Sequence, residues 1–330
     1  MALETSNYIS LNDVTELTSS HLVESIKDYE ERFKWQLARD DKMQFRKTVV
    51  RLANHDLKPM ADVYHTQAES LLTKLLECSK HKPCRSYICP HCRKKRQTEA
   101  QARAVAKFSS YGFDNTRFIT ILLPAVKDIT GYHNTIKAHR KRLTSILSRQ
   151  TENISLMGAF EIDHKIPNNF WTIGPRTKAL YTDLGIDDFT TSWFTPHIHL
   201  IAGIPDELSV KELKGSIGQA FYNGNIPPRS IRIEKFRQTF SESRKHLPPL
   251  AISADLDKVL DKTASYIFKA RLQYTWMQYE QVNADTRSKR TAYSHRTYEV
   301  IPLVSLVNEI DSNGGFKSMK YDYRMSSRVV

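Results

Sequence analysis

The chain has 330 residues, of which 40% are hydrophobic and 26% charged; this ordinary globular usage excludes a collagen-like, low-complexity or wholly disordered chain. Its formal net charge of +13 favours a polyanionic partner, because each Lys or Arg that neutralises a phosphate releases a condensed counterion. We expect a cytosolic protein with no membrane role, because no apolar run is long enough to span a bilayer and the first residues lack a secretory-signal pattern.

Residues 1–77 are predicted to form a helical N-terminal region. Apolar side chains recur there at three- and four-residue spacing, which is the period of an amphipathic helix. They are Ile26, Tyr29, Phe33, Leu37, Leu71, Leu72, Leu75 and Leu76. Arg46, Lys47 and Arg51 give the region a basic face, a pattern more typical of a solvated surface than of a binding site.

All four cysteines fall in the stretch CSKHKPCRSYICPHC, as Cys78, Cys84, Cys89 and Cys92. The last two are separated by two residues, the gap that lets two thiolates bind one tetrahedral ion. Free buried thiols and a redox pair are the alternatives in a reducing cytosol, but the clustering favours a structural zinc site. The ligand set stays open, because a histidine within the stretch can replace a thiolate. The candidates are His81 and His91.

A basic segment follows the cysteines directly, and we group residues 78–110 as a zinc-binding cluster with a basic helix. The cations are Arg93, Lys94, Lys95, Arg96, Arg103 and Lys107. Two interpretations are equally supported. The metal can fix a helix that grips phosphates, or it can organise the chain and leave the basic face solvated.

Residues 111–284 are predicted to form an α+β domain. Short β-rich apolar runs alternate with amphipathic segments in the order β-α-β-β-α-β-α. The predicted elements are strands at 118–124, 154–162, 193–204 and 230–236 and helices at 133–150, 208–221 and 256–272. This order is typical of an antiparallel sheet with helices on one face, a relative of the split βαβ (ferredoxin-like) arrangement. Residues 285–330 form a tail to which the sequence assigns no role.

The strand at 193–204 contains two histidines in the run TPHIHLI. Because strand side chains alternate, His197 and His199 point to the same face, about 7 Å apart, where they can share one metal ion. Two imidazoles inside an apolar strand need a reason to be there. The alternative is a buried histidine pair held by backbone hydrogen bonds.

The preceding strand carries Glu161 inside an apolar run, where an unpaired carboxylate is costly. If the two strands pair, Glu161 would complete a site of two histidines and one carboxylate, which suits Mn²⁺ or Mg²⁺ with a phosphate ligand. Asp163 lies two residues further on the same face and competes for this role. A partly exposed glutamate at a strand end is the alternative.

The helix at 256–272 contains Tyr266 and Lys269. Residues three apart share a helical face, so the ammonium can approach the phenol oxygen or its target. The phenol has an ordinary pKa of about 10, so attack by a phenolate requires a base or a nearby cation. The alternative is a tyrosine at the edge of the core beside a solvated lysine.

In this order the motifs resemble those of the HUH endonucleases, in particular the replication initiators (Rep proteins) of rolling-circle plasmids and related phages. FITILLP is similar to their first motif, TPHIHLI to the second and YIFK to the third. The resemblance covers residues 78–275, and histidines that precede the tyrosine match replication initiators rather than conjugative relaxases.

The resemblance implies a role for each site residue. His197, His199 and Glu161 would hold Mn²⁺ or Mg²⁺ against a scissile phosphate. Tyr266 would attack in line, giving a 5′-phosphotyrosine link and a free 3′-hydroxyl, and Lys269 would offset the developing charge or position the phosphate. The implied activity is site-specific nicking and rejoining of single-stranded or hairpin origin DNA, with a host helicase and polymerase as partners.

One position departs from the family pattern. Some relatives carry a second tyrosine or a glutamate one helical turn before the nucleophile, where this chain has Lys262, and the neighbouring Asp261 faces elsewhere. The chain is therefore expected to use a single tyrosine. Termination would need a second subunit in a dimer, water activated by another acid, or Tyr274. An HUH-type transposase and a non-catalytic zinc-containing nucleic-acid-binding regulator are the alternative functions.

Overall fold

The computed structural model of this chain describes residues 20–34, 39–53, 62–149, 154–166, 175–204, 207–236, 255–269, 274–282, 285–293 and 300–324. These residues form two compact units. The first unit comprises the described residues up to Lys94 together with residues 300–308. The second comprises the described residues between Lys95 and Ser294 together with those from Glu309 onward. No helix in the described ranges is long and apolar enough to cross a membrane.

The first unit confirms the predicted helical N-terminal region. Its helices are α2 (Ser20–Arg32), α3 (Arg39–Ala53) and α4 (Asp62–Leu76). Tyr29 and Phe33 are buried, and the Tyr29 ring stacks on Phe45 with centroids 3.8 Å apart. Arg46 forms an ion pair with Glu30, so this cation joins α2 to α3. Leu37 and the side chains of Lys47 and Arg51 lie outside the described residues.

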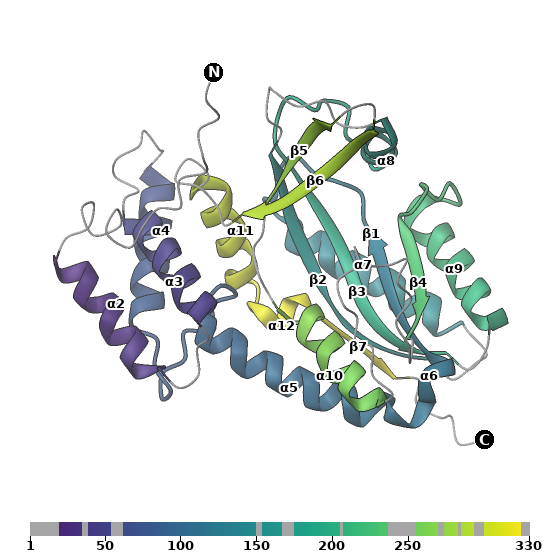
Figure 1. Cartoon of the computed structure of the whole chain (residues 1–330), viewed down its shortest axis with the longest axis horizontal. Helices are drawn as coiled ribbons and strands as arrows, with labels where there is room; N and C mark the ends of the chain where they lie inside the picture. The colour runs from purple at the N-terminus through teal and green to yellow at the C-terminus, as the bar shows by residue number, and fades with distance from the viewer. Residues whose placement is uncertain are drawn as a thin grey trace. The chain divides into compact units, whose positions relative to one another are not determined.

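The second unit confirms an α+β architecture with an antiparallel sheet (Figure 1). Four strands lie in the order β4-β1-β3-β2, and every adjacent pair among them is antiparallel. The elements up to the end of this sheet are α5 (Pro90–Phe108), the 3₁₀ turn η2 (Ser109–Tyr111), α6 (Gly112–Asn115), β1 (Thr116–Leu122), α7 (Tyr132–Leu147), β2 (Ser155–Ile166), α8 (Pro175–Asp183), β3 (Trp193–Gly203), α9 (Glu207–Tyr222), β4 (Ile231–Lys235) and α10 (Leu256–Ile267).

The C-terminal part of the chain adds to the outer edge of β2. Strand β7 (Lys320–Arg324) pairs antiparallel with the first half of β2, from Ser155 to Ala159. The hairpin of β5 (Tyr274–Val282) and β6 (Asp285–Tyr293) meets the far end of β2, where β5 runs parallel to it. Along the chain, α11 (Val300–Ser312) and α12 (Phe316–Met319) come between the hairpin and β7. The tail that the sequence left without a role thus completes the sheet.

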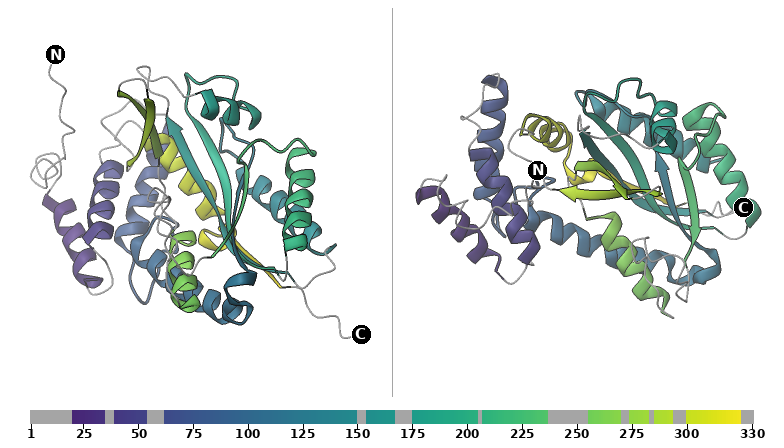
Figure 2. Two further views of the ribbon diagram at one scale, coloured as in Figure 1. Left: turned by 45° about the vertical axis from the view of Figure 1, so that its right-hand side comes forward. Right: turned by 45° about the horizontal axis from the view of Figure 1, so that its top comes forward.

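Helices cover both faces of the sheet (Figure 2), so the expectation of helices on one face was wrong. On one face, Arg140 of α7 lies 5.8 Å from the ring of Phe160, and α7 packs against α9 through His139 and Phe221. On the other face lies α10, whose Tyr266 ring is 5.5 Å from that of His199. Because side chains alternate along a strand, β2 places Phe160 toward α7 and Glu161 toward α10.

Besides the C-terminal strands, which the sequence did not indicate, the structure differs from the sequence expectation at the end of α10 and in the segment before β3. Helix α10 ends at Ile267, although the apolar pattern continues to residue 272. Between β2 and β3, where the sequence analysis predicted no element, lies α8. The residues that follow this helix, Leu184 and Ile186, pack with Tyr181 against Trp193. Of the α8 side chains that the structure describes, only Tyr181 is buried, so the sequence pattern did not indicate a helix there.

Candidate functional site

Glu161, His197 and His199 converge on the α10 face of the sheet. The register pairs Glu161 of β2 with His197 of β3, and His199 follows two residues along the same strand. Oε2 of Glu161 lies 3.4 Å from Nε2 of His197 and 3.5 Å from Nε2 of His199. One ligand atom from each residue lies within 4.8 Å of the others, and all three residues are buried. The predicted two-histidine, one-carboxylate group is therefore confirmed as a cluster.

Neighbouring groups orient both imidazoles. The Nδ1–H of His197 donates to the carbonyl oxygen of Thr195 at 3.2 Å, so that Nε2 is the ring nitrogen that faces Glu161. The Thr120 hydroxyl of β1 lies 3.0 Å from Nδ1 of His199, and the Phe118 ring stacks on the same imidazole. Such outer partners fix the ring orientation of metal-binding histidines. The sequence analysis missed Thr120, although it is the polar residue of the FITILLP strand.

The ionisation of the cluster reflects its burial and its mixed charges. Burial, with the nearby His197, lowers the pKa of His199 to about 3, which keeps this imidazole neutral. Burial opposes the charged forms of Glu161 and His197 as well. The imidazole of His197 and the ammonium of Lys269 nevertheless lower the pKa of Glu161, and the two carboxylates of Glu161 and Asp163 raise the pKa of His197.

The donor set of this cluster fits a divalent cation. Among the described residues, neither carboxylate oxygen of Glu161 has a hydrogen-bond partner, although both are buried. Oε1 is paired with the Lys269 ammonium at 3.2 Å, so Oε2 is the atom that lacks a cation. A buried carboxylate oxygen without a hydrogen bond is costly, and a divalent ion held between Oε2 and the two imidazole Nε2 atoms would remove this cost. Two nitrogen donors and one carboxylate leave coordination positions open for a further oxygen ligand. The structure does not identify the ion.

Tyr266 and Lys269 of α10 lie beside the cluster. The Tyr266 ring centroid is 5.5 Å from that of His199. Nζ of Lys269 is 3.2 Å from Oε1 of Glu161 and 4.3 Å from the centre of the Tyr266 ring. Burial raises the pKa of the Tyr266 phenol above its ordinary value; the Lys269 ammonium opposes this shift, and the carboxylates of Glu161 and Asp163 add to it.

Asp163 is not part of the three-residue cluster. Its carboxylate accepts a hydrogen bond from Nζ of Lys165 at 2.9 Å, and Lys165 is buried. Although burial acts in the opposite direction, the charges of Lys165 and His197 lower the pKa of Asp163 to about 2. The sequence analysis considered Asp163 as the competitor of Glu161 but did not identify Lys165. The position of Lys165, two residues further on the same face of the strand, could have indicated that it pairs with Asp163.

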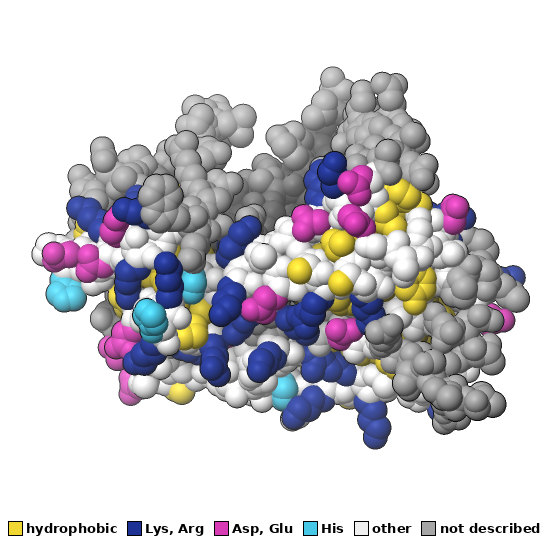
Figure 3. Space-filling view, turned by 90° about the horizontal axis from the view of Figure 1, so that it is seen from below, with side chains coloured by type: hydrophobic (Ala, Val, Ile, Leu, Met, Phe, Trp, Pro, Cys, Tyr) yellow, Lys and Arg dark blue, Asp and Glu magenta, His cyan; other side chains and the backbone are white. Residues whose placement is uncertain are grey.

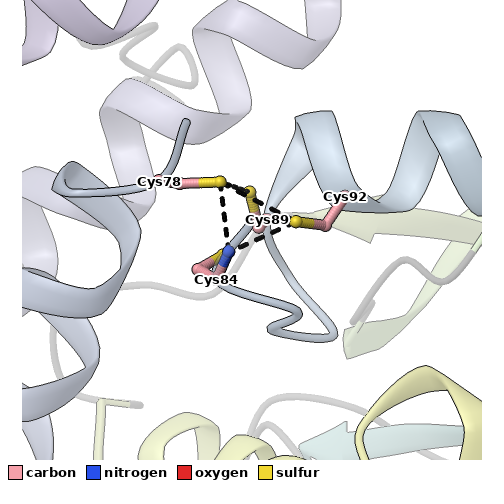
Figure 4. A group of neighbouring side chains, drawn as sticks. All are labelled: Cys78, Cys84, Cys89 and Cys92. Atoms are coloured by element: carbon pink, nitrogen blue, oxygen red, sulfur yellow. Dashed lines mark hydrogen bonds between the residues drawn. The ribbon is translucent and has the colours of Figure 1, made fainter. Parts of the chain in front are cut away.

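The four cysteines form a second cluster, in the first unit (Figure 4). Their sulfur atoms lie within 4.8 Å of one another, and Sγ of Cys92 is 3.7 Å from both Cys78 and Cys84. Sγ of Cys89 lies 3.6 Å from Cys78. All four thiols are free of disulfides. Four sulfur atoms at these distances are compatible with one tetrahedral zinc ion.

Neither histidine of the cysteine stretch belongs to this cluster. The His91 ring stacks on Phe33 of α2, with centroids 4.0 Å apart, and His81 is exposed. Among the described residues of this stretch, the donors that converge are therefore the four sulfur atoms and neither histidine. Cys92 lies in the first turn of α5, so a bound ion would hold the beginning of this helix.

Tyr29 is a contact of the cysteine cluster that the sequence did not indicate. Its hydroxyl lies 3.3 Å from Sγ of Cys89, and it accepts a hydrogen bond from the backbone N–H of His91 at 3.4 Å. The phenol is buried, and its periodic position in α2 indicated only a core residue. Hydrogen bonds of this kind stabilise thiolate ligands.

The basic helix after the cysteines is α5, and Lys and Arg side chains are spread over the face that carries α5 and α10 (Figure 3). Lys95 and Arg103 are exposed. The ammonium of Lys107, in contrast, donates to the carbonyl oxygens of Leu156 and Tyr323 and pairs with Asp322. These contacts would have to break before Lys107 could bind a phosphate. Whether this surface grips phosphates stays a prediction.

The positions considered for termination are placed as follows. Lys262 is exposed on α10. Asp261 accepts a hydrogen bond from Nε2 of Gln101 at 2.9 Å, which is a structural use of this carboxylate. Tyr274 begins β5, where its backbone pairs with His164, and its side chain lies outside the described residues.

Comparisons with family models, curated proteins and solved structures found no match for this chain. The residues themselves define its class: an α+β protein with an antiparallel sheet and a helical N-terminal region. Two sites compatible with metal ions distinguish it, the buried Glu-His-His cluster and the four-cysteine cluster.

Proposed function

We propose that this protein is a rolling-circle replication initiator of the HUH endonuclease type, which nicks and rejoins single-stranded DNA at a plasmid or phage origin. The observation that carries the proposal is the position of Tyr266, whose ring lies 5.5 Å from His199 of the buried cluster. A phenol beside a candidate metal site, with a lysine ammonium next to both, is the arrangement that tyrosine transesterification requires.

Glu161, His197 and His199 would hold Mn²⁺ or Mg²⁺, which when bound supplies Lewis-acid polarisation of the scissile phosphate. Lys269 would stabilise the negative charge that develops on the phosphate oxygens. Thr120 and the carbonyl of Thr195 would keep both imidazoles oriented, because they contact the Nδ1 atoms. The buried setting of the cluster strengthens these electrostatic interactions by excluding water.

In the proposed reaction the Tyr266 oxygen attacks the phosphorus, and a new P–O bond to tyrosine forms while the P–O3′ bond breaks. The phenol proton passes to water, and the departing 3′ oxygen takes a proton from water. The products are a 5′-phosphotyrosine and a free 3′-hydroxyl that a polymerase can extend. Attack of a later 3′-hydroxyl on the same phosphorus reverses the step, so rejoining needs no other energy source.

The four cysteines would hold a structural zinc ion. Their converging sulfur atoms support this assignment, and the histidine positions do not compete with it. Such an ion would stabilise the fold around α2 and the beginning of α5, through Tyr29 and Cys92. The net charge of +13 supports a nucleic acid as the partner, because most of the affinity for DNA comes from phosphate contacts.

The test is a covalent adduct. Purified protein with Mn²⁺ is mixed with single-stranded oligonucleotides that tile both strands of the DNA flanking the coding sequence. We expect one oligonucleotide to give a denaturation-resistant protein–DNA band. Tyr266→Phe should abolish this band, and His197→Ala should weaken it strongly while DNA binding is mostly retained. A full-strength band from Tyr266→Phe, or the absence of any band with the wild-type protein, would contradict the proposed function.

A further inference from the structure

The last turn of α10, which carries Tyr266, departs from regular α-helical hydrogen bonding. The amide of Phe268 donates to the carbonyl of Ala264 at 2.9 Å, as in an α-helix. The amide of Lys269, however, donates to the carbonyl of Tyr266 at 3.3 Å, so the turn tightens toward 3₁₀ geometry. The carbonyl of Ser265 is therefore left without the amide that would close the next α-helical turn.

Gln97 of α5 supplies the donor for this carbonyl. Its Nε2 donates to the carbonyl oxygen of Ser265 at 2.5 Å and to the Ser265 hydroxyl at 2.8 Å. One amide group from a second helix thus caps the turn that contains Tyr266. A carbonyl at a helix C-terminus is commonly satisfied by a side chain in this way.

The contact between Gln97 and Ser265 belongs to a polar seam between α5 and α10. Four residues further along α5, Gln101 donates to Asp261, four residues back along α10, at 2.9 Å. Ser109 then donates to Asp257 at 2.6 Å, near the first turn of α10. The helices are antiparallel along this seam, and only its Gln97 end contacts the turn with Tyr266.

The capped turn contains Tyr266 and leads directly to Lys269, the two α10 side chains that lie beside the cluster. Lys269 reaches Oε1 of Glu161 at 3.2 Å from a backbone whose amide is bonded to Tyr266 rather than to Ser265. Without a donor from Gln97, the carbonyl of Ser265 would compete for the Lys269 amide. The turn would then relax from about 120° to about 100° per residue, and Lys269 would rotate away from the carboxylate.

We propose that Gln97 is a positioning residue for the nucleophile, because it caps the α10 turn at Ser265 and thereby sets Tyr266 and Lys269 against the Glu161–His197–His199 cluster. This inference rests on the proposed function, in which Tyr266 attacks the DNA. It assigns no contact with DNA to Gln97. The affinity for DNA should therefore not depend on this side chain, whereas the rate of the chemical step should.

The experiment compares single-turnover rates of adduct formation with the oligonucleotide identified by the tiling assay. Gln97→Met keeps the length of the side chain without a donor, and Gln97→Glu keeps its shape and places an acceptor against the carbonyl. Both should lower the rate about ten- to a hundredfold, which is the usual cost of a misplaced reacting group, with an unchanged Kd for the oligonucleotide. The matched control is Gln101→Met, which opens the seam one turn away from Ser265 and should change the rate less than about threefold.

Thermal unfolding shows whether each variant is folded at the assay temperature, and Gln97→Glu serves if Gln97→Met is not. Wild-type rates in both Gln97 variants would overturn the inference. So would a loss in Gln101→Met equal to that in Gln97→Met, or a loss that lies wholly in the Kd. An adduct with Tyr266→Phe would instead overturn the proposed function, so the two failures are distinguishable.

Discussion

Lys269 and Glu161 form an ion pair, with Nζ 3.2 Å from Oε1, in which Glu161 is buried and Lys269 is partly exposed. The other oxygen of the same carboxylate, Oε2, faces the two histidines at 3.4 and 3.5 Å. Glu161 thus divides its two oxygens between the lysine and the imidazoles. Because the Lys269 ammonium also lies 4.3 Å from the Tyr266 ring centre, this pair connects the candidate metal site to the candidate nucleophile.

Replacing Lys269 with Met should therefore lower the rate of adduct formation about ten- to a thousandfold, because a preorganised cation at the reacting phosphate is lost. Single-turnover assays at saturating oligonucleotide measure this rate directly. Lys262→Met is the matched control, since Lys262 is exposed on the same helix, and it should be close to wild type. Equal rates for Lys269→Met and wild type would contradict the assigned role.

Thr120→Val should weaken metal binding at the Glu161–His197–His199 cluster. Valine has nearly the shape of threonine but cannot form the hydrogen bond that the Thr120 hydroxyl makes with Nδ1 of His199 at 3.0 Å. Loss of such an outer partner typically costs about ten- to a hundredfold in affinity. Calorimetric titration with Mn²⁺ measures the effect. Thr144→Val, which removes a hydroxyl contact with Tyr321 on the α7 face, should leave the Kd for Mn²⁺ unchanged.

Gly158→Ala should destabilise the sheet at the site itself. A Cβ at position 158 would lie 1.9 Å from the backbone oxygen of His199, so β2 and β3 would have to separate where they align Glu161 with His197. We expect a loss of about 2 kcal/mol or more in the free energy of unfolding, measured by urea denaturation, together with weaker Mn²⁺ binding.

Gly215→Ala is the control, and we expect it to stabilise the protein rather than destabilise it. Position 215 lies in α9 with no atom within 4 Å of an added Cβ, so alanine should raise the free energy of unfolding by about 0.5–1 kcal/mol. If Gly158→Ala were as stable as wild type, the close approach of the two strands would not be required by the fold.

Tyr29→Phe should accelerate loss of zinc from the cysteine cluster. Phenylalanine retains the stack on Phe45 but lacks the hydroxyl that lies 3.3 Å from Sγ of Cys89. We expect about tenfold faster transfer of zinc to a chromogenic chelator. Tyr64→Phe, in α4 of the same unit, is the control. Elemental analysis that finds no zinc in the wild-type protein would contradict the assignment of the metal itself.

Strands β1 to β4 and the Glu161–His197–His199 cluster could be predicted because their signals are local. His197, His199 and Glu161 are polar residues within apolar strands, where only a specific partner explains them. The alternation of side chains then placed them on one face. The choice between Glu161 and Asp163 needed the register of β2 against β3, which pairs His197 with Glu161.

Other features depend on contacts between distant residues, which no local pattern records. Tyr29 meets Cys89 across 60 residues of sequence, and Gln97 meets Ser265 across 168. Strand β7 pairs with β2 although 160 or more residues separate them in sequence. The end of α10 at Ile267 was missed because apolar spacing continues beyond it, whereas its last turn is in contact with a side chain from α5.

Peptide mapping of the protein–DNA adduct tests the central claim most directly. The adduct formed with Mn²⁺ is digested with nuclease and protease, and the modified peptide is identified by mass spectrometry. The account predicts that the nucleotide is attached through its 5′ phosphate to the peptide that contains Tyr266, at the phenol oxygen. A nucleotide attached to Tyr274 or to any other residue would contradict it.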